Sequence, residues 1–562
     1  MKKRLIEHNI PLAEISEESA REKNIRHGHP STLHIWWARR PLAASRATAF
    51  AALIDDPGPD EPAPEGSGFE TKREYLQDLI KRITPWEAVK DGNSEAIEEA
   101  QQLIAEQYGQ APKVLDPFAG GGSIPLEALR LGCETYASDY NPVAVFIEKA
   151  TLEWPQKFGI EVELPKELVH GSTRMNTDEK SKEKSVKSVQ SVVQKKIWDE
   201  GETEKVNLLA YLVEKWANII LEEARAEIGQ FYPHESSDGL IGFREIKHQD
   251  GWIPVGYLWA RTIPCQNPGC GAEIPLIKQF WLAKKKNKKI AYRPVVDYEN
   301  KRVDFEILEN AAAIEAANFD PSEGTVSRAN ARCLVCEQIT KAKQVRQLAQ
   351  DGKMGERMVA AVLRNPSQFG KGYRTANECD KHIYSKAKKY LLRKIKSWQY
   401  LETPLPSEKL PEIGTLGFSV QRYGMEHWED IYNSRQKLAL LTFIEKILEK
   451  TTQIQDDCYV FLTGAKLSKN QEEFSHAILG YLGLILSKMS DFSSSICLLN
   501  YTGGRGVKNA FGRGALPITW DYIESNIFND AGASWPANLN GIVKAIKTLH
   551  FTSRATGYVK PG

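Results

Sequence analysis

The stretch KVLDPFAGGGSIPLEALRLGCETYASDYNP, residues 113–142, constrains the fold more than any other part of the chain. One apolar run ends at Asp116, glycines fill positions 120–122, a helical pattern covers 124–131, and a second apolar run ends at Asp139. A strand, a glycine loop, a helix and a strand in this order form a βαβ unit, which requires a parallel sheet. The sequence therefore predicts an α/β domain around this stretch.

The glycine loop is suited to binding a ligand. Glycines let the backbone turn sharply and let a ligand approach it closely. A carboxylate at the end of the second strand, here Asp139, is placed to accept hydrogen bonds from ribose hydroxyls. A dinucleotide-binding loop would have the spacing G-x-G-x-x-G, but Ser123-Ile124-Pro125 leaves no place for its third glycine. A glycine-rich turn in another doubly wound domain is the alternative interpretation.

The form DPFAGGG resembles motif I of S-adenosylmethionine-dependent amino-methyltransferases that act on DNA. Phe118, Gly120 and Gly122 match the F-x-G-x-G core of that motif. The resemblance implies a Rossmann-like methyltransferase sheet, a loop that lines the methionine moiety of the cofactor, and a carboxylate that holds the ribose. The cofactor-binding residues that it implies are Asp116, Pro117, Phe118, Ala119, Gly120, Gly121, Gly122 and Asp139.

The N-terminal stretch HGHPSTLHIWWARRPLAASRA, residues 27–47, is dense in histidine, arginine and tryptophan. Arginine binds phosphates through paired hydrogen bonds, and tryptophan stacks on bases. The alternative is a docking segment whose tryptophans belong to a core. The stretch closely resembles the opening of a bacterial and archaeal family of adenine-specific DNA methylases that contain a zinc ribbon. In such enzymes a segment before motif I commonly helps to enclose the cofactor.

Two close cysteine pairs predict a metal site. Cys265 and Cys270 have the spacing C-x4-C, and Cys333 and Cys336 the spacing C-x2-C, about sixty residues further on. Two such pairs in turns supply four thiolates to tetrahedral zinc and leave no open position, so we expect a structural zinc. Four unrelated buried cysteines are the alternative. The methylase family carries its zinc ribbon in the same relative place. A β insertion with the basic turn KKKNKK, residues 284–289, is expected between the pairs.

Contacts with double-stranded DNA must come from local patches, because the formal net charge is only +1. The lysines at 284–289 are the first candidate, and the basic helical pattern at 380–398 is the second. An ordinary solvated surface helix explains that second pattern equally well. Further candidates are Arg422, Tyr423, Trp428 and Arg435, for which the alternative is that they order a helix-capping loop. The glycine- and arginine-rich stretch 503–522 is the last candidate, as the lining of a cleft.

The chain is expected to be cytoplasmic and to have no membrane partner. Its longest apolar run, residues 477–487, is too short to span a bilayer and predicts a buried helix. Paired cysteines with metal-site spacing favour a reducing compartment. We expect five segments: the N-terminal signature (1–60), the methyltransferase core (61–175), a linker with low-complexity residues 177–196 and a helical insertion (176–260), the zinc ribbon with its β insertion (261–341), and a mostly helical region with DNA-recognition candidates (342–562).

The second motif of amino-methyltransferases is absent from this sequence. That motif, [DNS]-P-P-[YFW], ends another strand, grips the target amine and stacks on the flipped base. No Pro-Pro dipeptide occurs in the chain, and RNPSQF at 364–369 lacks the second proline and an aromatic residue in register. In the family the tetrad follows the helical region. We therefore expect it, and the rest of the parallel sheet, beyond residue 562, so that the resemblance covers the front part of a longer enzyme.

The resemblance implies an S-adenosylmethionine-dependent DNA methyltransferase that acts on adenine N6, with cytosine N4 as the alternative target and no catalytic residue assigned in this chain. The alternative, from another functional class, is a noncatalytic DNA- or cofactor-binding subunit completed by a separate chain. Such methylases often accompany restriction-modification and other defence systems, so their proteins are candidate partners beside a C-terminal catalytic chain.

Overall fold

The computed structural model describes residues 3–25, 28–166, 169, 202–232, 235–236, 239–240, 252–365, 367–368, 370–502, 506–512, 514–529, 532–551 and 557–561. The low-complexity residues 177–196 lie outside the described residues. The chain divides into two compact units, and each draws on separate stretches of sequence. The first comprises Met1–Asn218, Lys450–Ile485 and Leu539–Gly562, and the second Ile219–Glu449 and Leu486–Asn538.

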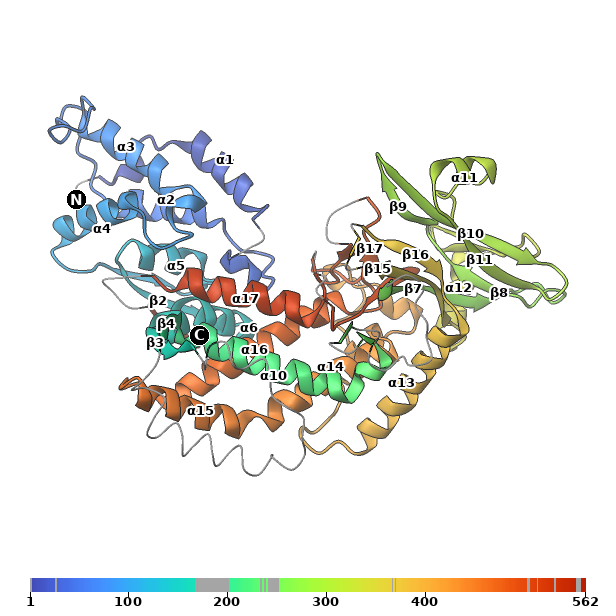
Figure 1. The fold of residues 1–562 in the computed structure, drawn as a ribbon. Helices are drawn as coiled ribbons and strands as arrows, with labels where there is room; N and C mark the ends of the chain where they lie inside the picture. The colour runs from blue at the N-terminus through green and yellow to red at the C-terminus, as the bar shows by residue number, and fades with distance from the viewer. Residues whose placement is uncertain are drawn as a thin grey trace. The chain divides into compact units, whose positions relative to one another are not determined.

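Four helices open the first unit: α1 (Leu12–Glu22), α2 (Leu42–Leu53), α3 (Lys72–Ile83) and α4 (Glu95–Tyr108). They pack side by side, coloured blue in Figure 1, around a core of leucine, isoleucine and alanine side chains. The Thr71 hydroxyl caps α3 by accepting a hydrogen bond from the backbone amide of Glu74, and Gly109 ends α4 with a φ of +70°.

A parallel sheet follows these helices in the first unit. Its strands are β1 (Lys113–Asp116), β2 (Glu134–Asp139) and β20 (Gly557–Pro561), in the order β1-β2-β20. Helix α5 (Ser123–Arg130) connects β1 to β2, and these two strands pair in parallel register. The predicted strand, loop, helix and strand are thus confirmed. The third strand comes from the opposite end of the chain, which no pattern around residue 113 could reveal.

The first unit also contains several short helices and a strand pair that follow β2 in the chain. After β2 come α6 (Pro142–Glu148), a π-helical turn (Lys149–Glu153), α7 (Trp154–Phe158) and the antiparallel pair β3 (Glu161–Pro165) and β4 (Thr203–Asn207). Helix α15 (Thr451–Gly464) also belongs here. Three further helices contribute residues to both units: α10 (Leu208–Ile228), α16 (Gln471–Phe492) and α17 (Trp535–Leu549).

In the part of the chain that the structure describes, no helix is both long and apolar enough to cross a membrane.

The second unit is built on an antiparallel sheet with the strand order β16-β15-β7-β19, and β8 pairs with β7 as well. The central strand β7 (Ile253–Pro264) is buried along almost its whole length. Its partners are β8 (Glu273–Leu276), β15 (Gly355–Arg364), β16 (Gly372–Thr375) and β19 (Asp521–Ser525). Three of these strands come from the region after residue 341. That region therefore combines helices with strands and completes the sheet that begins at residue 253.

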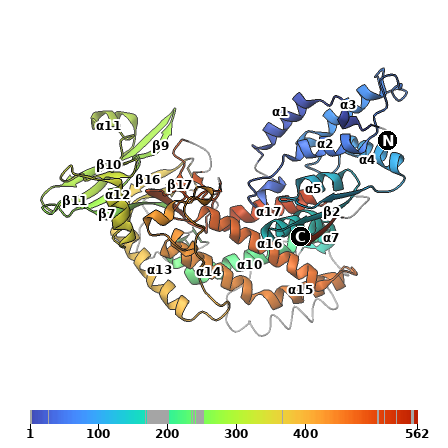
Figure 2. The same ribbon diagram turned by 180° about the vertical axis from the view of Figure 1, so that it is seen from behind.

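A three-stranded antiparallel sheet lies between the two cysteine pairs in sequence, as predicted for the β insertion. Its strands are β9 (Trp281–Lys285), β10 (Lys288–Asp297) and β11 (Arg302–Leu308). Helix α11 (Ala311–Ala316) packs on it, which is visible from both sides in Figures 1 and 2. A smaller sheet follows: β12 (Val326–Ser327), β13 (Asn330–Arg332) and β14 (Ile339–Thr340).

The second unit also contains three helices: α12 (Ala342–Gln350), α13 (Glu378–Lys396) and α14 (Ser434–Glu449). It has two short antiparallel strand pairs: β5 (Glu235–Ser236) with β6 (Gly239–Leu240), and β17 (Leu498–Leu499) with β18 (Val507–Lys508). The described chain is therefore a mixed α/β protein in which the parallel strands belong to the first unit and the cysteines of the predicted metal site to the second.

Candidate functional site

The glycine loop runs from the end of β1 to the start of α5 and is tied to the end of β2. Gly120 and Gly122 have φ values of +55° and +71°, a region that side-chain-bearing residues rarely adopt. The Asp139 carboxylate accepts hydrogen bonds from the backbone amides of Gly120, at 3.0 Å, and Asn141, at 2.8 Å. The Asp116 carboxylate accepts one from the amide of Phe118 at 3.2 Å. The loop thus sits at the carboxyl edge of the parallel strands, where open α/β sheets bind ligands.

Two aromatic side chains are exposed beside this loop. Phe118 and Tyr140 are 70% and 79% exposed, and their ring planes are inclined by 30° with centroids 6.2 Å apart. Phe118 lies two residues after the end of β1, and Tyr140 lies one residue after the end of β2. Large exposed aromatic side chains at a ligand-binding edge present flat faces on which a planar ring can stack.

The N-terminal segment lies against the glycine loop. A Cβ atom added to Gly120 would stand 2.5 Å from the Trp36 Nε1, and one added to Gly121 would stand 3.0 Å from the Arg39 Cζ. The Arg39 Nη1 donates a hydrogen bond to the carbonyl oxygen of Gly121 at 3.0 Å. Trp36 therefore leaves no room for a side chain at Gly120, and Arg39 leaves little room for one at Gly121. The N-terminal signature, expected from the resemblance to help enclose a cofactor, thus lies against the glycine loop.

A buried ion pair fixes this segment to the helix that follows the loop. The Arg46 guanidinium on α2 is 1% exposed, and its Nε donates to the Glu127 carboxylate on α5 at 2.5 Å. The Nη1 of the same arginine donates to the carbonyl oxygen of Ile83 at 2.6 Å. The grouping of Arg46 with the phosphate-binding arginines is therefore wrong, because its charge is neutralised in the core. Its role is to hold α2 against α5.

Glu148, at the end of α6, is a buried acid beside the loop. Its side chain is fully buried, and neither carboxylate oxygen has a hydrogen-bond partner among the described residues. Its Cγ would lie 3.7 Å from a Cβ atom added to Gly122. Burial, reinforced by the negative charges of Asp139 and Asp116, raises the pKa of this carboxyl to about 8. No motif pointed to Glu148; the available signal was one acidic residue closing the otherwise apolar run VAVFI.

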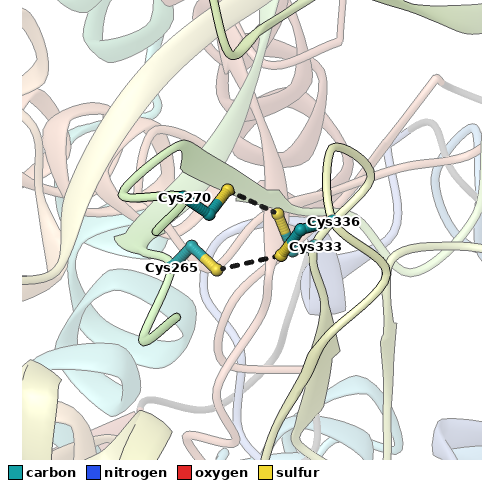
Figure 3. Close-up of side chains that lie close together, drawn as sticks. All are labelled: Cys265, Cys270, Cys333 and Cys336. Atoms are coloured by element: carbon teal, nitrogen blue, oxygen red, sulfur yellow. Dashed lines mark hydrogen bonds between the residues drawn. The ribbon is translucent and has the colours of Figure 1, made fainter. Parts of the chain in front are cut away.

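The four cysteines of the predicted metal site converge in the second unit (Figure 3). Their sulfur atoms all lie within 4.8 Å of one another. The Sγ atoms of Cys265 and Cys336 are 3.6 Å apart, and those of Cys270 and Cys333 are 3.9 Å apart. Tetrahedral zinc with Zn–S bonds of about 2.3 Å separates its sulfur ligands by about 3.8 Å. The cluster is therefore compact enough to hold one tetrahedral metal ion.

Tight turns place these sulfurs. In the first turn, between β7 and β8, the backbone amides of Cys270 and Gly271 both donate to the carbonyl oxygen of Asn267, and Gly271 has a φ of +64°. In the second, between β13 and β14, the amide of Glu337 donates to the carbonyl oxygen of Cys333 at 3.0 Å. Each turn projects its pair of thiols toward the other. All four ligand positions come from the chain, which is the arrangement of a closed, structural site.

The lysine turn is the tip of the β9–β10 hairpin. Lys285 lies directly opposite Lys288, and Lys284 directly opposite Lys289. Like charges directly opposite each other destabilise a sheet, so this arrangement is unfavourable for the hairpin alone. The Lys288 Nζ donates to the carbonyl oxygen of Lys371 at 2.6 Å, and burial together with Lys285 lowers the pKa of Lys371. The hairpin is therefore a concentrated positive surface.

The other DNA-contact candidates divide into exposed and buried groups. On α13, most lysines are exposed, but Lys394 is buried and pairs with Glu227 at 2.6 Å and with Glu445. Arg435 is fully buried, and its Nε and Nη2 donate to the two carboxylate oxygens of Glu524 at 2.7 and 2.9 Å. The assignment of Arg435 to a DNA-facing surface is therefore wrong. Tyr423 is also a core residue, 7% exposed.

A family model described as a protein of unknown function, DUF1156, matches residues 9–79. The matched stretch spans α1, α2 and the first part of α3, and it includes Trp36, Arg39 and Arg46. No curated protein and no solved structure matches the chain. The match therefore covers the segment that lies against the glycine loop, without assigning it an activity.

Proposed function

We propose that this chain is the cofactor-binding part of an S-adenosylmethionine-dependent DNA methyltransferase that acts on adenine N6. The observation that carries the proposal is the glycine loop after β1, in which Gly120 and Gly122 have left-handed backbones and the amide of Gly120 donates to Asp139 at the end of β2. The motif I resemblance of DPFAGGG supplies the chemical identity of the ligand. On this proposal the β1-β2-β20 sheet belongs to a Rossmann-like methyltransferase domain, and the reaction is direct transfer of a methyl group.

The residues around the loop fit this cofactor. Trp36 and Arg39 lie against Gly120 and Gly121, 2.5 and 3.0 Å from where Cβ atoms would stand, so the N-terminal segment would flank a cofactor bound at the loop. The buried Arg39 Nη2 has no hydrogen-bond partner among the described residues and offers a donor to an anionic group. Asp139 is only partly buried, so its carboxylate oxygens offer acceptors to ribose hydroxyls besides the two amides they already bind.

Each of these residues has a positioning task. The loop glycines allow the methionine moiety to approach the backbone, Asp139 holds the ribose, and Phe118 and Tyr140 offer ring faces for the adenine. When bound, S-adenosylmethionine supplies a methyl group already activated by its sulfonium. The protein therefore contributes orientation and electrostatics, which convert a bimolecular encounter into an intramolecular step.

Zinc is the metal that we propose for the cysteine cluster. Four thiolates arranged tetrahedrally are the usual ligand set of structural zinc. Binding of the ion would link the β7–β8 turn to the β13–β14 turn and contribute to the folding of the second unit. DNA would be contacted by local positive surfaces, with the β9–β10 hairpin tip as the leading candidate.

The proposal is tested by pairing a binding measurement with a transfer assay. Calorimetric titration of S-adenosylmethionine should show one site, and Asp139→Ala should weaken it by about 1.5–3 kcal/mol, since it removes charge-assisted hydrogen bonds. A radiolabelled methyl-transfer assay on mixed-sequence DNA should show no transfer, because no D/N-P-P-aromatic motif occurs in the sequence. Robust methylation by these 562 residues would contradict the assignment of the catalytic motif to another segment.

The second candidate is a noncatalytic DNA- or cofactor-binding subunit that a separate chain completes. The absence of any Pro-Pro dipeptide favours it. Adding a candidate catalytic chain to the same transfer assay separates the two functions. Transfer that appears only with both chains, and that needs Asp139, supports a divided enzyme. Cofactor binding that no such chain ever converts into transfer supports a binding subunit.

A further inference from the structure

Arg39 carries a positive charge against the glycine loop without an acidic partner among the described residues. Its Nη1 donates to the carbonyl oxygen of Gly121, whereas its Nη2 is buried and has no hydrogen-bond partner there. Glu22 is the acid whose field reaches this guanidinium, but its carboxylate is already occupied. It accepts hydrogen bonds from the backbone amides of Leu42, at 2.9 Å, and Ala43, at 2.8 Å, and it contacts the His29 Nε2 at 3.1 Å.

Two fully buried arginines of this protein, by contrast, each have a carboxylate partner. Arg46 is paired with Glu127, and Arg435 is paired with Glu524 through two hydrogen bonds. Pairing of this kind offsets the free energy lost when a charge leaves water. Arg39 has no such pairing, and burial lowers its pKa to about 10. An unneutralised guanidinium beside a ligand-binding loop is the arrangement expected where the ligand itself brings the negative charge.

We infer that Arg39 is an anion-binding residue of the glycine loop and that its free nitrogen takes the α-carboxylate of the cofactor's amino-acid moiety. This inference rests on the proposed function. Its guanidinium carbon and nitrogens would lie 3.0–3.2 Å from a Cβ atom added to Gly121, so the group lies directly against the loop. Its fork of donors matches a planar carboxylate. A nucleotide phosphate has the same recognition chemistry, and the experiment below separates the two sources.

The test compares Arg39 with its neighbour. Arg40 is exposed and only reaches the carbonyl oxygen of Ala38 at 3.5 Å, so Arg40→Gln is a matched control. Titrations of S-adenosylmethionine, its decarboxylated form and ATP are run with the wild type, Arg39→Gln, Arg39→Lys and Arg40→Gln. Loss of a charged hydrogen-bond donor predicts roughly 10- to 150-fold weaker binding of S-adenosylmethionine to Arg39→Gln. Arg39→Lys should recover part of the lost affinity, and Arg40→Gln should bind S-adenosylmethionine as tightly as the wild type.

The decarboxylated compound provides a readout that does not depend on how a variant folds. The wild type should bind it more weakly than S-adenosylmethionine, and Arg39→Gln should bind both compounds alike. Equal binding of the two compounds to the wild type would overturn the carboxylate assignment. Binding of ATP that depends on Arg39, without binding of S-adenosylmethionine, would support the anion site while contradicting the proposed function. Identical behaviour of Arg39→Gln and Arg40→Gln toward every ligand would overturn the inference entirely.

Discussion

At the scale of single residues, Glu148 beside the glycine loop makes the stability of the folded protein depend on pH. Its pKa is raised from 4.5 to about 8, so the folded chain keeps a proton that the unfolded chain releases. The contribution of the protonated Glu148 carboxyl to the free energy of unfolding is therefore fully present below pH 4.5 and is lost as pH rises through about 8. One proton of difference corresponds to at most about 1.4 kcal/mol of stability per pH unit.

Glu148→Gln should remove this pH dependence and raise stability at pH 8 relative to the wild type. Chemical denaturation at several pH values between 5 and about 8.5 would measure the change in slope. Glu163→Gln, at an exposed position of β3, is the matched control and should leave the slope unaltered. Equal slopes for the wild type and Glu148→Gln would show that the carboxyl ionises normally in the folded protein.

The buried Arg46–Glu127 pair makes a second residue-scale prediction. Glu127→Gln leaves the Arg46 guanidinium buried without a counter-charge, which should cost about 3–5 kcal/mol of unfolding free energy. Lys72→Met, which breaks the exposed pair with Glu61, should cost less than about 1 kcal/mol. Denaturation curves of both variants would test this difference. A loss as small for Glu127→Gln as for Lys72→Met would contradict the structural role given to the buried pair.

At the scale of elements, the two cysteine turns should fold around one metal ion. Metal analysis of the purified protein should find about one equivalent of zinc, and the double substitution Cys333→Ser with Cys336→Ser should remove it. Cys379→Ser, outside the cluster, is the control and should retain the ion. A metal-free protein that is fully folded and resists unfolding as well as the zinc-loaded form would refute the metal site.

The β9–β10 hairpin predicts a salt effect on DNA binding. Replacing Lys284, Lys285, Lys286, Lys288 and Lys289 with alanine should flatten the plot of log affinity against log salt, by about 0.9 for each DNA phosphate that these lysines neutralise. The control replaces exposed lysines of α13, namely Lys386, Lys388 and Lys389. A slope that changes only with the α13 variant would assign the phosphate-binding surface to that helix instead of the hairpin.

At the scale of the whole molecule, local patterns predicted local structure well. The β1–α5–β2 unit, the four converging cysteines and the hairpin between them all follow from short stretches whose spacing has a direct physical meaning. The pairing of β20 with β2, and of β7 with β15 and β19, depends on contacts between segments far apart in the chain, which leave no periodic signal in the sequence.

The candidate site likewise combines residues that local sequence predicts with residues whose roles depend on distant contacts. Its glycines and Asp139 could be predicted from the motif, whereas the roles of individual arginines could not. Arg39, Arg46 and Arg435 look alike in the sequence, but two of them are neutralised by glutamates from other elements and one is not. Only the packing of α2 on α5, and of α14 beside β19, decides which positive charge remains for a ligand.

The most direct test of the central claim is a calorimetric titration of S-adenosylmethionine into wild type, Gly120→Val and Gly66→Val. Both glycines have positive φ values, but a Cβ atom at Gly66 meets nothing within 4 Å, whereas one at Gly120 meets Trp36. The account predicts one binding site in the wild type, retained in Gly66→Val and lost in Gly120→Val. Absence of binding to the wild type, or binding that Gly120→Val leaves intact, would contradict the glycine loop as the cofactor site.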